Sequence, residues 1–124
     1  MAEGGAIAAE LRRLEKSKAD RLIFERDNFE CQYCGHNGRT FEGWCHLVVD
    51  HIMPKYLARQ RGDDPNRDGN LVTACWSCNQ LKGMSKTENF EQAKATVDKF
   101  RNQMRDKIWV HEFAPFVREG GSGG

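Results

Sequence analysis

The sequence contains no apolar run long enough to cross a membrane, and its N-terminus lacks the basic stretch and apolar core of a secretory leader. We therefore expect a cytoplasmic protein with no membrane partner. The sequence also lacks an excess of charge of one sign, because 19 Lys and Arg face 18 Asp and Glu and the formal net charge is +1. The overall charge therefore gives no argument for a polyanionic partner, and any nucleic-acid surface must come from local clustering.

The 124 residues contain five cysteines, and an odd number cannot all be paired in disulfides within the chain. Four of the five fall into two Cys-x-x-Cys pairs, a pattern that suits thiolate binding of a metal better than a secreted disulfide framework. The fifth, Cys45, is expected to be a small buried thiol. A single domain of this length lies near the size at which small folds benefit from a metal staple.

The two pairs, Cys31 with Cys34 and Cys75 with Cys78, predict one structural zinc site. Each pair supplies two thiolates from a single turn, and a tetrahedral site closes when two such pairs meet. Because both pairs are complete, no coordination position stays open for a substrate, and we assign this zinc to folding alone. His36 beside the first pair is expected to be a bystander.

Composition and periodicity divide the chain into four segments. These are an amphipathic helical segment (1–25), a core that contains both cysteine pairs (26–84), a C-terminal helix and tail (85–119), and a Gly/Ser linker or expression scar (120–124). In the N-terminal segment, apolar residues recur at helical spacing from Ile7 to Leu22 and predict one helix, or two joined near residues 17–20, that covers the core.

Within the core, the β-branched stretch from His46 to Ile52 predicts a strand. A second short strand is expected over residues 70–74, followed by a short helix that ends at Gly83. The residues between the two strands read as a long loop with one helical turn near residues 56–61.

After the core, Ser85 with Glu88 three residues later forms a capping-box pattern. The apolar residues that follow, from Phe90 to Ile108, recur at helical spacing and predict one long helix buried against the core. We expect the aromatic residues of the tail to pack as well; these are Trp109, Phe113 and Phe116.

The segment between the cysteine pairs carries residues suited to phosphodiester chemistry. Asp50 is a hard oxygen ligand for Mg²⁺ or a similar ion, and His51 is a base that can be neutral near physiological pH. Asn79, on the helix that faces the strand, offers a second hard oxygen. These residues predict a nuclease site; the alternative is a zinc-stabilised nucleic-acid-binding module without catalysis.

The ordered set of motifs resembles the HNH nuclease family, the ββα-metal endonucleases, in its zinc-clamped form. The motifs are Cys31-x-x-Cys34, the run from Val49 to Lys55, Asn70-Leu71-Val72, and Cys75-x-x-Cys78-Asn79-x-x-Lys82-Gly83, with a similar lead-in from Arg26 to Cys31. The resemblance implies an α+β fold in which a ββα-metal core with a four-cysteine zinc is flanked by N-terminal and C-terminal helices.

The resemblance also implies a role for each matching residue. His51 corresponds to the general base and Asp50 to the adjacent metal-binding acid. Asn70 corresponds to the central Asn that ties the loop between the strands. Asn79 stands where the family often has His, so this chain is an HNN variant in which the ligands favour Mg²⁺ or Mn²⁺. The implied activity is a metal-dependent DNA endonuclease or nickase that leaves a 5′-phosphate and a 3′-hydroxyl.

Contacts to DNA outside this site are poorly specified by the sequence. Lys82, Lys55 and His46 are candidate nucleic-acid contacts, and His46 shares a strand face with Asp50 by two-residue alternation. No base-reading motif is present, so we expect a weak sequence preference. The sequence is compatible with a monomer or a homodimer.

Overall fold

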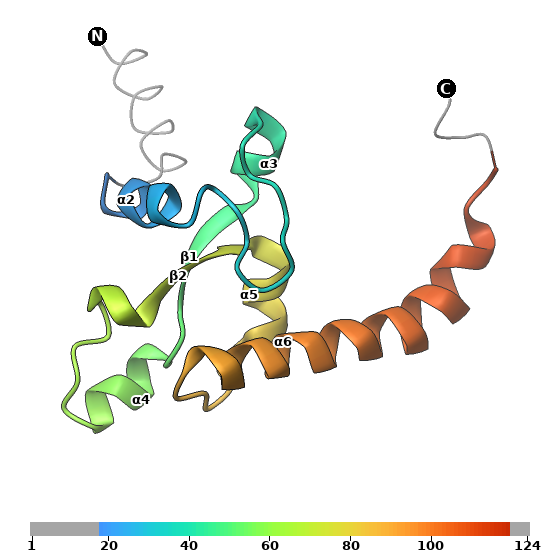
Figure 1. Cartoon of the computed structure of the whole chain (residues 1–124). Coiled ribbons are helices and arrows are strands. Elements are labelled where there is room, and N and C mark those ends of the chain that lie inside the picture. The colour runs from blue at the N-terminus through green and yellow to red at the C-terminus, as the bar shows by residue number, and fades with distance from the viewer. Residues whose placement is uncertain (1–17, 120–124) are drawn as a thin grey trace, which may run out of the picture.

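The computed structural model describes residues 18–119. Most of the predicted N-terminal helix and the linker at 120–124 lie outside these residues. The described elements, shown in Figure 1, are α2 (Lys18–Arg26), α3 (Phe41–Cys45), β1 (Leu47–His51), α4 (Lys55–Gln60), the 3₁₀ turn η1 (Asp68–Asn70), β2 (Leu71–Cys75), α5 (Trp76–Lys82), α6 (Phe90–Met104), the π-helix η2 (Arg105–Phe113) and the 3₁₀ turn η3 (Ala114–Phe116).

The two strands form one antiparallel sheet whose register sets the position of the site. Leu47 lies opposite Cys75, and His51 lies opposite Leu71. Cys75 of the second cysteine pair therefore lies beside the start of β1, whereas His51 lies at its end. The second cysteine pair and His51 are thus separated by the length of the strand. Both predicted strands and the helical turn between them are confirmed.

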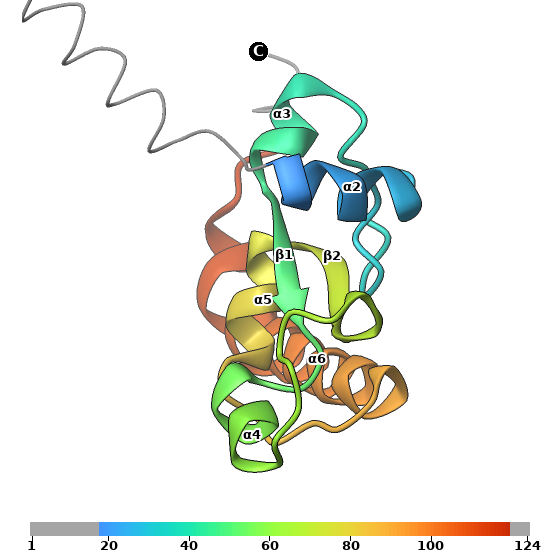
Figure 2. The same ribbon diagram turned by 90° about the vertical axis from the view of Figure 1, so that its left-hand side faces the viewer.

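Helices cover both faces of this sheet, as Figures 1 and 2 show. On one face, the Thr73 hydroxyl donates a hydrogen bond to the carbonyl of Ile23 in α2. On the other face, Val72 and Ala74 pack with Val97 of α6 in the main buried cluster. Because successive strand residues point to opposite faces, the side chains of Asp50 and His51 leave β1 on opposite faces of the sheet. The fold is a mixed helix and two-stranded sheet, consistent with the expected ββα-metal core.

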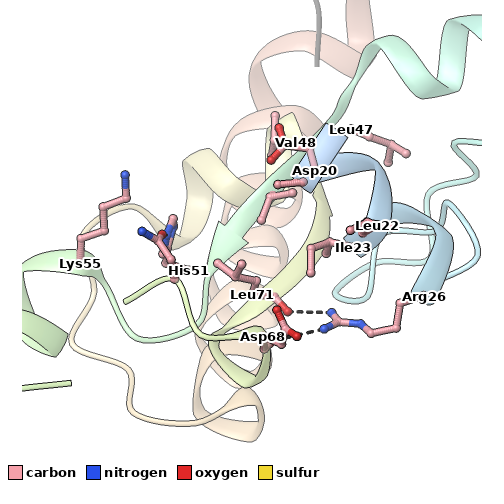
Figure 3. Close-up of a pocket in the computed structure, with 13 residues that line it drawn as sticks. Asp20, Leu22, Ile23, Arg26, Leu47, Val48, His51, Lys55, Asp68 and Leu71 are labelled. Carbon is pink, nitrogen blue, oxygen red and sulfur yellow. Dashed lines mark hydrogen bonds between the residues drawn. The ribbon is translucent and has the colours of Figure 1, made fainter. Parts of the chain in front are cut away.

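The segment that leads into the first cysteine pair fastens α2 to β2. Arg26 donates to the carbonyls of Asp68 (3.1 Å) and Leu71 (2.7 Å), drawn as dashed lines in Figure 3. The Asp27 carboxylate accepts a hydrogen bond from the Thr73 amide at 2.9 Å. Burial opposes the charged form of Asp27, but hydrogen bonds from Arg26 and Thr73 outweigh it and lower the pKa of this carboxyl.

Helix α3 was not expected from the sequence. It begins after Thr40, whose hydroxyl accepts a hydrogen bond from the Gly43 amide at 3.0 Å. Gly43 is required here because a Cβ atom would lie 2.0 Å from the Asn37 carbonyl oxygen. Cys45, at the end of α3, is exposed, so the expectation of a buried thiol is wrong.

The predicted helix α5 is confirmed, and Gly83 ends it with a φ of 53°. The predicted capping box is wrong: the side chain of Asn89 caps α6 by accepting from the Gln92 amide at 2.9 Å. The Ser85 amide instead donates to the Lys82 carbonyl, so this residue belongs to the turn after α5 and cannot cap α6.

The burial predicted for the C-terminal helix holds only for its first half. Ala93 and Val97 are fully buried, but Met104 and Ile108 are 48% and 44% exposed. The three aromatic residues of the tail are also exposed; these are Trp109, Phe113 and Phe116. Figure 1 gives the reason, because α6 runs past α5 and leaves the body of the domain. Among residues 18–119, no helix is long and apolar enough to cross a membrane.

Candidate functional site

The four paired cysteines meet at one point, as the sequence predicts. The sulfurs of Cys31, Cys34, Cys75 and Cys78 all lie within 4.8 Å of one another, and those of Cys34 and Cys75 are 3.7 Å apart. Four thiolates around a tetrahedral zinc, with Zn–S bonds of about 2.3 Å, lie about 3.8 Å apart. The residues therefore fit a four-cysteine zinc site.

Local backbone geometry and charge support this zinc site. Gly35 has a φ of 81° and its amide donates to the Cys31 carbonyl, which makes the tight turn of the first pair. Contacts with Cys75 and Cys78 lower the pKa of Cys31, and the contact with Cys31 raises the pKa of Cys75 to about 11. Sulfurs this close cannot all be thiolates unless a cation lies among them. Arg101 adds positive charge, with its guanidinium 3.8 Å from the Cys78 sulfur.

A second site lies at the end of β1. A cleft of about 390 Å³ is lined by Asp50 and His51 from β1, by Asn79 and Lys82 from α5, and by Lys55 from α4. Strand β1 ends at His51, and Pro54 turns the chain into α4. The structure thus brings together the residues proposed as base, acid and second metal ligand.

His51 is held by a contact that sequence reasoning missed. Its Nε2 atom lies 2.9 Å from the Oδ1 atom of Asn66. A carboxamide oxygen can only accept, so Nε2 is the donor in this contact, and in the neutral ring the lone pair then lies on Nδ1. No hydrogen bond occupies Nδ1 among the described residues. Asn66 lies in an irregular loop 15 residues away, and no spacing rule points to it.

Asn70 ties this loop together, as expected for the central Asn. The side chain is buried; its oxygen accepts from the Met53 amide at 2.8 Å, and its nitrogen donates to the carbonyls of Met53 and Pro65 at 3.0 and 2.9 Å. One side chain therefore joins Met53, the second residue after β1, to Pro65, the residue before Asn66. The position of His51 and the position of its partner Asn66 thus depend on the same amide.

Asp50 is only 5% exposed and uses one oxygen inside the protein. Its Oδ2 atom accepts from the Tyr33 hydroxyl at 2.6 Å and lies 3.5 Å from the Lys82 ammonium. Every buried side-chain oxygen or nitrogen in the described residues has a partner, yet Oδ1 has none, so Oδ1 reaches the surface of the cleft. Burial raises the pKa of Asp50, against the opposing effects of Lys82 and Tyr33.

Lys82 points inward and is 2% exposed, although the sequence analysis names it as a phosphate contact. Its ammonium donates to the His51 carbonyl at 2.7 Å as well as facing Asp50. Burial lowers the pKa of Lys82, and the charge of Asp50 opposes this effect. The side chain therefore connects α5 to the end of β1 and presents no charge to the surface.

The other two proposed nucleic-acid contacts lie in different places. Lys55 is exposed at the start of α4, near His51 in Figure 3. His46 ends α3, before β1 begins, and its ring lies edge-on to His36 at 6.1 Å. The structure does not bring His46 to Asp50, because the first three residues of β1 lie between them.

His51 also lines one end of a second, larger groove, shown in Figure 3. This groove of about 690 Å³ runs from α2 along β1 to His51, Lys55 and Asn66. Its charged lining residues are balanced, because the groove contains two acidic and two basic residues, namely Asp20, Asp68, Arg26 and Lys55. His51 therefore lines an opening to the surface on two sides, and the described residues form a strongly basic channel on neither side.

Comparison with known proteins gives a family match for the middle of the chain. Residues 31–85 match the family model described as HNH endonuclease, which confirms the resemblance for this segment of the chain. This segment contains both cysteine pairs and the strand-end cleft, and HNH domains as a class bind nucleic acid.

One relative is the Type 4 apparatus protein DotN of Legionella pneumophila subsp. pneumophila strain Philadelphia 1. The two sequences are 34% identical over 61 residues, which is 49% of this chain but only 23% of DotN. The chain therefore spans less than a quarter of that protein. No solved structure gives a significant match.

Proposed function

We propose that this domain is a metal-dependent DNA endonuclease or nickase with His51 as general base. The observation that carries the proposal is the cleft at the end of β1. It combines an imidazole whose Nδ1 is unoccupied, the accessible Oδ1 atom of Asp50, and Asn79. Binding alone does not require a base beside two hard oxygen ligands.

The donor set of the cleft fits Mg²⁺ or Mn²⁺. Asp50 and Asn79 offer a carboxylate and a carboxamide oxygen, and the Asn79 side chain makes no hydrogen bond in the described part of the chain. Mg²⁺ commonly binds through one or two protein oxygens and keeps water and phosphate as its other ligands. When bound, such an ion supplies positive charge that stabilises a phosphate undergoing substitution.

The protein residues then have separate tasks. The Nδ1 atom of His51 accepts a proton from a water molecule as the water oxygen attacks phosphorus. The bond from phosphorus to the 3′-oxygen breaks, that oxygen takes a proton from solvent, and the products are a 5′-phosphate and a 3′-hydroxyl. Asn66 holds the imidazole and Asn70 holds the loop that carries Asn66. Lys55, exposed beside the cleft, is positioned to contact a neighbouring phosphate.

The test is conversion of supercoiled plasmid to open-circular or linear DNA by zinc-loaded protein with Mg²⁺, Mn²⁺ or EDTA. We expect ion-dependent cleavage that falls by about 10²–10⁴-fold in His51→Ala, which is the usual contribution of a general base. The exposed residue Gln60 at the end of α4 provides the control, because Gln60→Ala leaves every cleft residue in place. Cleavage by His51→Ala at the parental rate would refute the assignment of the base.

The balanced lining of the groove in Figure 3 supports a weak sequence preference. Phosphate contacts give affinity without sequence information. We expect cut sites scattered along a long duplex. A few dominant cut sites in a sequencing map of the products would contradict this expectation.

A non-catalytic, nucleic-acid-binding role is the second candidate, and one observation favours it. Lys82 already balances the charge of Asp50 from 3.5 Å away, which disfavours a second cation on the same carboxylate. The name of DotN also describes an apparatus protein. Two results together would establish this role instead. The protein would bind DNA in a salt-sensitive way without cleaving it in any ion. Calorimetry would also detect no Mg²⁺ or Mn²⁺ binding that depends on Asn79, as judged by comparison with Asn79→Ala.

A further inference from the structure

An apolar cleft lies between α5 and the C-terminal helix, away from the strand-end site. It has a volume of about 600 Å³, with Trp76 and Leu81 on one wall and Met104 and Trp109 on the other. Trp76 and Trp109 are 57% and 47% exposed, which is unusual for side chains of this size. We name these four residues the tryptophan cleft.

The apolar surface continues beyond the cleft along η2. Ile108, Val110 and Phe113 are all more than two-fifths exposed. They extend the same helix whose earlier residues Ala93 and Val97 are fully buried in the core. Nothing in residues 18–119 packs over this surface, and Figure 1 shows the helix leaving the domain there. Large apolar side chains exposed beside an apolar cleft are typical of an interaction site.

The walls of the cleft are held by the zinc site. Trp76 directly follows Cys75, and its amide donates to the His46 carbonyl at 2.7 Å. On the opposite wall, Arg101 reaches the Cys78 sulfur at 3.8 Å. Because both walls are tied to the same cluster, the cleft is formed before any partner arrives, which lowers the entropic cost of binding.

The charges around the cleft define the chemistry of the occupant. Arg101 and Arg105 lie one helical turn apart and both line the cleft, whereas no Asp or Glu of the described residues lines it. Within residues 18–119, Arg105 is engaged only by its near neighbours Asp106 and Asn102, through solvent-exposed contacts of small energetic value. An occupant that matches this lining has apolar side chains on one face and carboxylates beside them.

We infer that the tryptophan cleft binds an acidic amphipathic helix of a partner protein. Apolar side chains of that helix fill the space between Trp76 and Trp109, and its carboxylates pair with Arg105. Two aliphatic wall residues, Leu81 and Met104, favour a peptide over stacked nucleic-acid bases. The strand-end cleft is lined by other residues of α5, so nucleic acid and the partner helix can bind together.

The test uses a fluorescent synthetic helix with leucine on one face and glutamate on the other. A matched peptide has lysine in place of every glutamate. We expect saturable binding of the glutamate peptide alone, weakened about tenfold by Trp109→Ala and by Arg105→Glu. Arg59→Glu, an exposed change on α4, is the control and keeps the parental affinity. Unchanged melting temperatures establish that each variant is folded.

Three results would overturn the inference. The first is equal binding of both peptides, or binding of neither. The second is a single-stranded oligonucleotide that binds the protein and loses affinity in Trp109→Ala but not in Arg59→Glu, which would assign the cleft to nucleic acid. The third is a dimer in sedimentation analysis that Trp109→Ala converts to monomer, which would assign the surface to a second copy of this chain.

Discussion

Replacing Asn66 tests whether its carboxamide positions the base. Asn66→Leu keeps the shape of the side chain but removes the oxygen that lies 2.9 Å from Nε2 of His51. One hydrogen bond has a net value of about 0.5–1.5 kcal/mol. If this bond stabilises the orientation of His51 that accepts the proton, its loss slows cleavage by about 2- to 13-fold. The effect is much smaller than the 10²–10⁴-fold expected for loss of the base itself.

Three comparisons separate positioning from a general structural effect. Asn66→Asp keeps an acceptor oxygen at the same place and is expected to retain cleavage. Asn66→Leu lowers kcat while KM for DNA and the melting temperature stay unchanged, because the side chain is exposed. In a His51→Ala background, Asn66→Leu has no further effect, since the residue it positions is absent.

The refuting result is a loss of the same size in both backgrounds, which would mean that Asn66 acts independently of His51. Nitrogen-resolved NMR of the imidazole gives a readout that does not depend on activity. We expect the proton on Nε2 in the parent and in Asn66→Asp, and a mixture of the two tautomers in Asn66→Leu.

Three further predictions concern the fold. Chelation of zinc from the four-cysteine site is expected to unfold the core, with one zinc released per chain in a colorimetric assay; retention of the parental circular dichroism after zinc removal would contradict the structural role. Asp27→Asn weakens the link to Thr73 and lowers the free energy of unfolding by about 1 kcal/mol at neutral pH. Because the pKa of Asp27 is lowered in the folded state, this stabilisation is complete above the unfolded pKa of about 4 and is lost as pH falls through the folded value, so parent and variant converge on acidification while zinc remains bound. Gly43→Ala is expected to destabilise the domain in urea titrations because its Cβ meets the Asn37 carbonyl, whereas Gly69→Ala, which approaches only the flexible end of an arginine, is the matched control.

Local signals explain what the sequence predicted well. The two Cys-x-x-Cys pairs fix short turns, strand alternation places Asp50 and His51, and Gly83 ends α5. Each of these features depends on a few adjacent residues, so it can be predicted without knowledge of the tertiary fold. The family resemblance predicts that Asn70 ties the loop between the strands, and its carboxamide bonds Met53 and Pro65 at the two ends of that loop.

Tertiary contacts explain the rest. Periodicity identified the apolar face of α6 but not the point where the core ends, so the exposure of Met104 was missed. The inward direction of Lys82 depends on Asp50 and on the carbonyl of His51, which lie across the fold. The contact of Asn66 with His51 joins a loop residue to a strand end, and neither has a sequence signal for the other.

The zinc clamp also determines the topology of the chain around the strand-end cleft. Cys34 and Cys75 are 41 positions apart, and a metal that joins them converts the intervening chain into a closed ring. Asp50, His51 and Asn70 all belong to this ring. In the cross-link model, closure of a loop of this length removes about 4 kcal/mol of conformational freedom from the unfolded chain. If the helices unfold while zinc stays bound, the closed ring therefore keeps these residues close together. Refolding of the cleft then requires only short movements of the chain.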